Sequence, residues 1–259
     1  MKLSVLMYHA VGSRQGMAGA DPHYSVSGES FGEHIKRLQA RGLEIRAVRD
    51  VVESDVPQTR VVAVTFDDGH ISNYETAFPA LLASDATADF FVNPSTVGSS
   101  NIVTWSALRE MDQAGMSIQS HSYTHRYLED LSAEAVRDEL TRSKAIIEDK
   151  LGRPVTTFAP PGGRINATVH RLAREAGYTT ICVSRPGQWR AGAITVPRFA
   201  VLASTLPENV EAWAVGRASV LARQVTGYWV RLGAKKALGN ALYDQVRARI
   251  LMGRNGDHG

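Results

Sequence analysis

The stretch Val62-Ala63-Val64-Thr65-Phe66-Asp67-Asp68-Gly69 decides the fold class, because an apolar, β-branched run is followed at once by two carboxylates and a glycine. Such a run predicts a buried strand, and barrels of parallel strands keep their catalytic groups where the strands end. Adjacent residues of an extended chain point in opposite directions, so both acids face one site only if the chain turns there. Gly69 permits that turn. A strand followed by an ordinary Asp-Gly turn is the alternative.

Five further short runs of this kind alternate with helical patterns up to about residue 205. The predicted strands cover residues 3–8, 88–92, 117–120, 156–159 and 179–183. Apolar residues at helical spacing predict helices around residues 31–38, 105–111 and 132–151. This alternation predicts a parallel sheet wrapped by helices. The Gly- and Ser-rich segment 11–30 is predicted to be a long functional loop.

The composition favours one main domain, predicted over residues 1–205, with a tail over residues 206–259. A chain of 259 residues with 44% hydrophobic residues can fill one barrel core. The single Cys182 excludes an internal disulfide. The apolar stretch at the N-terminus is too short for a signal peptide, and no run of about 18 apolar residues occurs. These features predict a cytoplasmic protein.

The net charge of +3 is distributed unevenly along the chain. From Arg217 to the end, eight Lys and Arg face two Asp, which gives +6, so the rest of the chain carries 3 − 6 = −3. No nucleic-acid-binding signature accompanies the basic residues, which argues against a nucleic-acid partner. Val225, Trp229, Leu232, Leu238, Leu242, Val246 and Ile250 recur at near-helical spacing. Such a basic amphipathic tail can lie on an anionic membrane surface, and thus beside a synthase, or pack on the barrel.

A second polar cluster, His121-Ser122-Tyr123-Thr124-His125, also follows a predicted strand. Histidines four residues apart lie on one face of a helical turn and can both reach one divalent ion. Two imidazoles and one carboxylate leave open positions for water and substrate, as a catalytic metal site requires. Histidines on an ordinary surface are the alternative.

Three motifs together resemble the polysaccharide deacetylase family, the NodB-like carbohydrate esterases. They are Thr65-Phe66-Asp67-Asp68-Gly69, Ser120-His121-Ser122-Tyr123-Thr124-His125 and Phe158-Ala159-Pro160-Pro161-Gly162-Gly163. The resemblance implies an α/β fold, a distorted (β/α)7 barrel, here with a C-terminal helical extension. It implies a divalent metal, zinc or otherwise cobalt, nickel or manganese, held by Asp68, His121 and His125. Asp67 is then the general base.

The third motif is expected to line the site. The resemblance implies that the backbone N–H of Gly162 contacts the oxyanion of the reaction. Pro160 and Pro161 make a stiff wall, since neither rotates freely about φ nor donates a hydrogen bond. A plain Pro-Gly-Gly loop is the alternative. Trp189 lies where family members place an aromatic residue against the acetyl methyl or the sugar, and ordinary loop packing is its alternative.

Two departures from the family pattern lead to further assignments. Many members carry an arginine at the position of Ala159, and we assign Arg198 of Pro197-Arg198-Phe199 as its replacement, with a surface arginine as the alternative. The usual C-terminal Leu-x-His motif is also absent. Instead Leu6-Met7-Tyr8-His9 resembles the permuted arrangement of the biofilm-polysaccharide (poly-N-acetylglucosamine) deacetylase branch, which makes His9 the general acid. A histidine with a structural hydrogen bond is the alternative.

The predicted function is metal-dependent hydrolysis of N-acetyl groups, or of O-acetyl groups, from a carbohydrate in exopolysaccharide or cell-envelope glycan metabolism. Motif residues specify amide or ester hydrolysis and say little about the acyl group, so a deformylase or another amidase stays open. An inactive carbohydrate-binding or assembly subunit is the alternative from another class, suggested by Ala159 and the basic tail.

Overall fold

A computed structural model describes residues 2–54 and 60–238, with side chains of the last helix up to Val230. Its main sheet runs in the order β10 (Gln188–Arg190), β1 (Lys2–Tyr8), β5 (Val61–Phe66), β6 (Asp89–Val92), β7 (Ser117–Ser120), β8 (Thr157–Phe158), β9 (Thr180–Val183) and β11 (Thr195–Pro197). β1 and β5 to β9 pair in parallel, and so do β9 and β11. The six strands predicted from the sequence are all present, within one or two residues.

One segment brings the two ends of this sheet together. β11 pairs with β9, whereas β12 (Phe199–Ala200) pairs with β1, and only Arg198 separates the two short strands. The sheet therefore curls into a nearly closed barrel of seven strands, if β11 and β12 are counted as one strand. The predicted α/β barrel of the polysaccharide deacetylase type is confirmed. β4 (Glu44–Arg46) extends the sheet beside β5.

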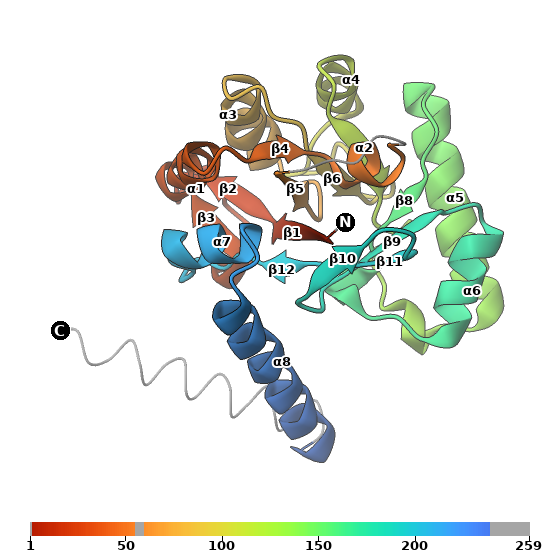
Figure 1. The fold of residues 1–259 in the computed structure, drawn as a ribbon. Coiled ribbons are helices and arrows are strands. Elements are labelled where there is room, and N and C mark those ends of the chain that lie inside the picture. Colours follow the sequence, from red (N-terminus) through yellow and green to blue (C-terminus); the bar gives the residue numbers. More distant parts are fainter. Residues whose placement is uncertain (1, 55–59, 239–259) are drawn as a thin grey trace.

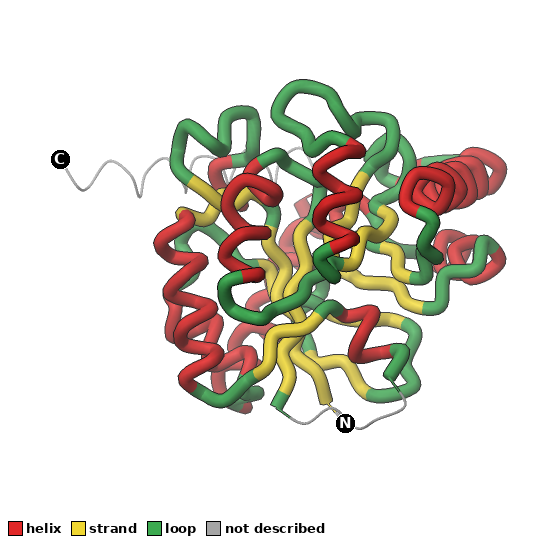
Figure 2. The backbone as a smooth tube through the Cα atoms, turned by 90° about the horizontal axis from the view of Figure 1, so that it is seen from above, coloured by secondary structure: helices red, strands yellow, loops and turns green. Residues whose placement is uncertain are grey.

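Helices surround the strands, as Figures 1 and 2 show. They are α1 (Gly28–Ala40), α2 (Val48–Val52), α3 (Phe78–Leu82), α4 (Trp105–Gln113), α5 (Ala133–Leu151) and α6 (Ala167–Glu175), followed by α7 (Pro207–Ala214) and α8 (Ala218–Leu238). The larger buried cluster lies between strands and helices, and residues of the smaller one include Val5, Ala63, Phe91 and Cys182. Helix formation is favoured by side-chain N-caps at Ser27, Thr104, Ser132 and Asn166.

The segment 11–30 is more structured than the long loop that its composition predicts. β2 (Ala10–Gly12) pairs in parallel with β3 (Ser25–Ser27), and a 3-10 turn (Pro22–Tyr24) precedes β3. α1 then starts within the segment, at Gly28. Strands of three residues are too short to give a periodic signal in the sequence.

The two helices after the barrel differ in how they contact it. α7 packs closely, because Trp213 stacks on Phe199 at 5.4 Å and its carbonyl accepts a hydrogen bond from Ser4 Oγ at 2.6 Å. α8 continues from α7 and projects away from the barrel (Figure 1). The predicted helical positions Leu242, Val246 and Ile250 lie outside the described residues. Within the described part, no helix is both long enough and apolar enough to cross a membrane.

Candidate active site and metal centre

Strand register gathers the predicted site residues at one edge of the barrel. Tyr8 pairs with Phe66, and Ser120 pairs with both Val92 and Phe158. The residues that follow these strands, His9, Asp67, Asn93, His121 and Ala159, therefore share the carboxyl edge, which is the catalytic edge of parallel barrels.

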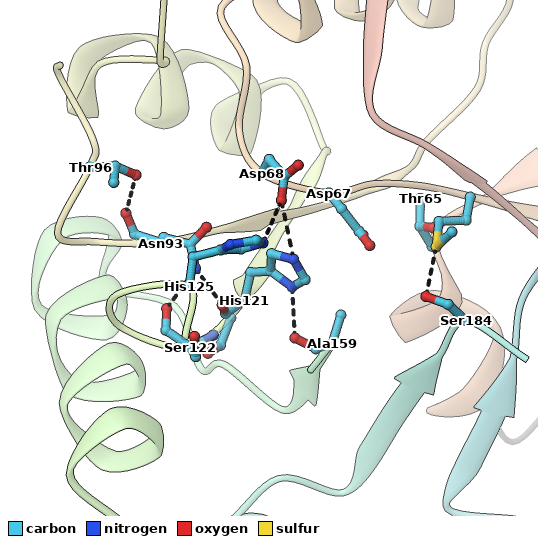
Figure 3. Close-up of polar contacts among 12 residues, drawn as sticks. Thr65, Asp67, Asp68, Asn93, Thr96, His121, Ser122, His125, Ala159 and Ser184 are labelled. Carbon is cyan, nitrogen blue, oxygen red and sulfur yellow. Dashed lines mark hydrogen bonds and ion pairs between the residues drawn. The ribbon is translucent and has the colours of Figure 1, made fainter. Parts of the chain in front are cut away.

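The two adjacent aspartates diverge because the backbone turns at the second of them. Asp68 and Gly69 both have left-handed φ angles, 72° and 65°. A left-handed φ is uncommon for a residue other than glycine and marks strain that surrounding structure must hold. Asp67 consequently points into the barrel and is 2% exposed, whereas Asp68 faces the two histidines (Figure 3). The sequence predicts a turn at Gly69, but the left-handed backbone already begins one residue earlier, at Asp68.

Asp68, His121 and His125 converge on one point. Asp68 Oδ1 lies 3.3 Å from Nε2 of His121 and 3.1 Å from Nε2 of His125. One potential ligand atom from each residue lies within 4.8 Å of the others. Figure 3 shows the two imidazoles on one side of the Asp68 carboxylate, with Asp67 directed away from them. The structure thus brings together the three residues that the sequence predicts as metal ligands.

The chemistry of these three residues fits a cation. His121 Nδ1 lies 2.7 Å from the carbonyl oxygen of Ala159, a contact that places the proton on Nδ1 and leaves Nε2 as a lone pair aimed at Asp68. Asp68 Oδ1 is buried and has no hydrogen bond within the described residues. Lone pairs facing one another without protons repel, and a divalent ion bound between them removes that repulsion.

A buried carboxylate holds the loop that carries His125. Glu139 of α5 accepts hydrogen bonds from the backbone N–H groups of Tyr123 and Thr124, each at 2.8 Å, and from the Thr124 hydroxyl. Ser122 and His125 have left-handed φ angles of 65° and 62°. The loop is therefore a turn with fixed hydrogen bonds, and not the regular helical turn expected from the four-residue spacing.

Sequence reasoning missed Glu139, and the sequence does contain a signal for it. Glu139 interrupts the apolar face of α5, between the buried residues Val136, Leu140 and Ile147. A charged residue on a buried stripe requires a partner, because burying an unpaired charge is costly. Asn93, also missed, follows β6 directly and donates to the carbonyl oxygens of His121 and Ser122.

Arg198 binds Asp67 in a two-pronged ion pair inside the barrel. Nη1 and Nη2 of Arg198 lie 2.6 and 2.8 Å from the two carboxylate oxygens of Asp67. Nη1 also donates to Thr65 at 3.2 Å, and the Arg198 side chain is fully buried. The guanidinium lies 5.3 Å from the ring centre of Phe91. Arg198 therefore contacts the proposed base, as its assignment to the missing arginine position requires.

The charges around the site set the ionisation of its carboxylates. Burial alone would raise the pKa of Asp67, but Arg198, His121 and His9 together hold that pKa below its usual value. Burial likewise opposes ionisation of Asp68, yet His121 and His125, when protonated, hold the pKa of this carboxyl well below its usual range. Both acids are therefore carboxylates at neutral pH.

His9 reaches the same edge from the first strand. Burial lowers the pKa of His9, while Asp67 and Asp68 act in the opposite direction and favour its protonated form. Its Nδ1 is buried without a hydrogen bond to any described residue. The ring packs against Tyr24, with centres 4.4 Å apart. The segment containing Tyr24 thus covers His9, which agrees with a functional role for part of segment 11–30.

The Pro-Gly-Gly loop lies beside His121 and is tightly packed. Pro160 and Pro161 are buried, and the carbonyl oxygen of Pro160 accepts from the N–H of Gly163 at 2.8 Å. Gly162 is exposed with φ 65°, and Tyr127 lies so close that an added Cβ would be 2.7 Å from its ring. This loop is therefore a rigid element next to the candidate metal ligands.

The expectation that Trp189 contacts substrate is wrong, because this residue lies at the other end of the barrel. It pairs with Leu3, at the amino end of β1, whereas His9 follows the carboxyl end of the same strand. Trp189 is 4% exposed and donates from Nε1 to the Ala193 carbonyl at 2.6 Å. It packs in the smaller buried cluster together with Leu3 and Val5.

Comparisons with known proteins agree with this geometry. The family model described as polysaccharide deacetylase matches residues 54–181. The peptidoglycan-N-acetylglucosamine deacetylase of Bacillus cereus is 33% identical over 129 residues, which cover 49% of this chain and 58% of that protein. The deacetylase PplD of Streptococcus pyogenes has a similar structure, with TM-score 0.74 and 28% identity, covering 83% of this chain and 98% of that one. IcaB from Ammonifex degensii gives 0.72 and 26%, with 82% and 97% covered.

The chain spans no more than about two thirds of the length of the curated relatives that it matches first. The two solved structures named above, in contrast, are covered almost completely. The region that the family model matches contains Asp67, Asp68, His121 and His125. The chain therefore contains a polysaccharide deacetylase domain.

Proposed function

We propose that this protein is a metal-dependent hydrolase that removes N-acetyl groups from a carbohydrate of an exopolysaccharide or the cell envelope. One observation carries the proposal: three ligand atoms converge beside a second, buried carboxylate that is not one of them. Two relatives support it, a peptidoglycan-N-acetylglucosamine deacetylase of Bacillus cereus and a chitin deacetylase of Pestalotiopsis that is 28% identical over 144 residues. Asp67 and Asp68 then have separate tasks.

Zinc is the proposed metal, because two imidazoles and one carboxylate are a common catalytic set for it. A divalent ion at Asp68, His121 and His125 supplies Lewis acidity toward a carbonyl oxygen and toward water. Asp67 accepts the proton of the attacking water. Arg198 holds both Asp67 oxygens, which fixes the direction of the carboxylate and keeps it ionised.

His9 delivers a proton to the leaving nitrogen. Amide cleavage needs this step, because an amine anion is a very poor leaving group, whereas a good leaving group needs little help. The N–H of Gly162 stabilises the developing oxyanion from the exposed surface of the Pro-Gly-Gly loop. Tyr127 packs against Gly162 and so restricts the position of that donor.

An acetate-release assay tests this function. The zinc-loaded protein is incubated with N-acetylglucosamine oligomers, O-acetylated sugars and N-formylated analogues, and acetate and formate are measured separately. We expect acetate from the N-acetylated oligomers, and a loss of about 10²–10⁴-fold in Asp67→Asn. Asp85→Asn is the matched control, because Asp85 is an exposed aspartate that is not one of the site residues.

Formate as the preferred product would replace the deacetylase with a deformylase. No hydrolysis of any of these substrates, with zinc bound, would favour a carbohydrate-binding or assembly subunit instead.

A further inference from the structure

The helix α8 leaves the barrel with apolar side chains exposed. Val220 and Leu221, in its first turn, pack against the main core. Farther along, Trp229 is 51% exposed and Val230 is 66% exposed. Figure 1 shows the helix projecting from the body beyond α7. Packing on the barrel therefore accounts for the start of α8 and leaves its later part without a partner among the described residues.

The apolar residues of α8 form a stripe that continues beyond the barrel. Leu221, Val225 and Trp229 are four residues apart and so lie along one side of the helix. Burial decreases along the stripe, since Leu221 contacts the core, Val225 is half-buried and Trp229 is exposed. Tyr228 contacts Trp229 edge to face, with ring centres 5.5 Å apart. Tyr and Trp are the residues that favour the boundary between lipid and water.

The charge of this region indicates which surface the stripe meets. Residues 217–238 contain five Lys and Arg and no acid, and residues 217–259 carry +6 in total. Among the described residues, Arg223 is exposed and makes no ion pair. A second copy of the same helix would bring like charges together, which argues against pairing of α8 with α8. An anionic lipid surface, in contrast, complements both the charge and the apolar stripe.

We propose that α8 binds the surface of an anionic membrane, with Trp229 in the interfacial layer and the basic residues at the lipid headgroups. The helix lies on the membrane and does not cross it. This binding is independent of the proposed hydrolysis, because the site residues belong to the barrel and vesicle binding requires no turnover. It holds the enzyme where membrane-attached or nascent glycans are made.

Co-sedimentation of the full chain with vesicles tests the proposal. We expect binding to vesicles containing phosphatidylglycerol, little binding to phosphatidylcholine alone, and release by high salt, which screens the attraction. Trp229→Ser combined with Val230→Ser should weaken binding about tenfold or more, because it removes apolar surface that would enter the interface. Leu82→Ser is the matched control, since Leu82 is an exposed apolar residue of α3.

Hydrolysis of a soluble oligosaccharide by the Trp229/Val230 variant should equal that of the wild type. Absence of binding to phosphatidylglycerol vesicles, or equal binding by the double variant, would overturn the proposal. A dimer in solution that dissociates in the double variant would also overturn it, and would assign the stripe to a second copy of the chain.

Discussion

At the scale of single residues, the first prediction concerns the contribution of the buried ion pair of Asp67 and Arg198 to stability. Removing one partner of a buried ion pair leaves the other charge uncompensated, which costs about 3–5 kcal/mol. We expect Arg198→Met to lower the free energy of urea unfolding by about that amount. Asp67→Asn combined with Arg198→Met should recover much of the loss, because no charge is then left buried. Simple addition of the two single effects would show that the pair is not coupled.

His9 gives a prediction that depends on the leaving group. We expect His9→Ala to slow the hydrolysis of an N-acetylated sugar by about 10²–10⁴-fold. The same variant should lose little activity toward an aryl acetate, whose leaving group departs without a proton. His170→Ala is the control, because His170 belongs to the outer helix α6. Equal losses on both substrates would remove His9 from the role of general acid.

At the scale of elements, the loop after β7 depends on α5. Glu139→Gln retains the shape of the side chain but removes the charge that three donors from Tyr123 and Thr124 share. Since groups that orient ligands affect metal affinity by about 10–100-fold, we expect a loss in that range, measured by zinc competition titration. Asp138→Asn, at an exposed position of the same helix, should leave the affinity unchanged. An unaltered affinity in Glu139→Gln would mean that the loop holds His125 without this carboxylate.

The Pro-Gly-Gly loop also depends on a neighbouring element. A Cβ at Gly163 would overlap Ser184, which follows β9, whereas Gly192 has a similar left-handed φ and open space around it. Gly163→Ala and Gly192→Ala therefore share the conformational strain, and only the first adds a clash. We expect Gly163→Ala to cost about 1–3 kcal/mol more in unfolding free energy. Equal losses of unfolding free energy in the two variants would show that Ser184 moves aside at little cost.

Much of this element-level organisation follows from the sequence. Short runs of apolar or β-branched residues predict the six main strands, and the motifs at their ends predict which residues meet, because parallel strands place their carboxyl ends together. The short strands β11 and β12 carry no such pattern, so the closure at Arg198 could not be predicted from periodicity. The prediction for Trp189 is wrong because the distance along the sequence from a motif does not determine at which end of the barrel a residue lies. The hydrogen bonds of Glu139 depend on contacts between distant residues, and only its place on a buried stripe hints at them.

At the scale of the whole molecule, Asp89 links stability to pH. Burial raises the pKa of Asp89 to about 7, and its Oδ1 has no partner among the described residues. In the unfolded chain the pKa of this carboxyl is about 4. Between these values the folded state holds a proton that the unfolded state releases, so the free energy of unfolding falls as pH rises. We expect Asp89→Asn to raise Tm at about pH 8 and to have a smaller effect near pH 5. The same change in Tm at both pH values would contradict the shifted pKa.

At this scale the central proposal is that the barrel binds one cation beside a second carboxylate that is not a ligand, and calorimetric zinc titration of four proteins tests it most directly. The wild type should bind a single equivalent, and Asp68→Ala and His125→Ala should each lose at least about tenfold in affinity. Asp67→Asn should bind zinc with stoichiometry and affinity close to those of the wild type, although it hydrolyses substrate about 10²–10⁴-fold more slowly. Loss of zinc binding in Asp67→Asn, or full binding in His125→Ala, would contradict the account.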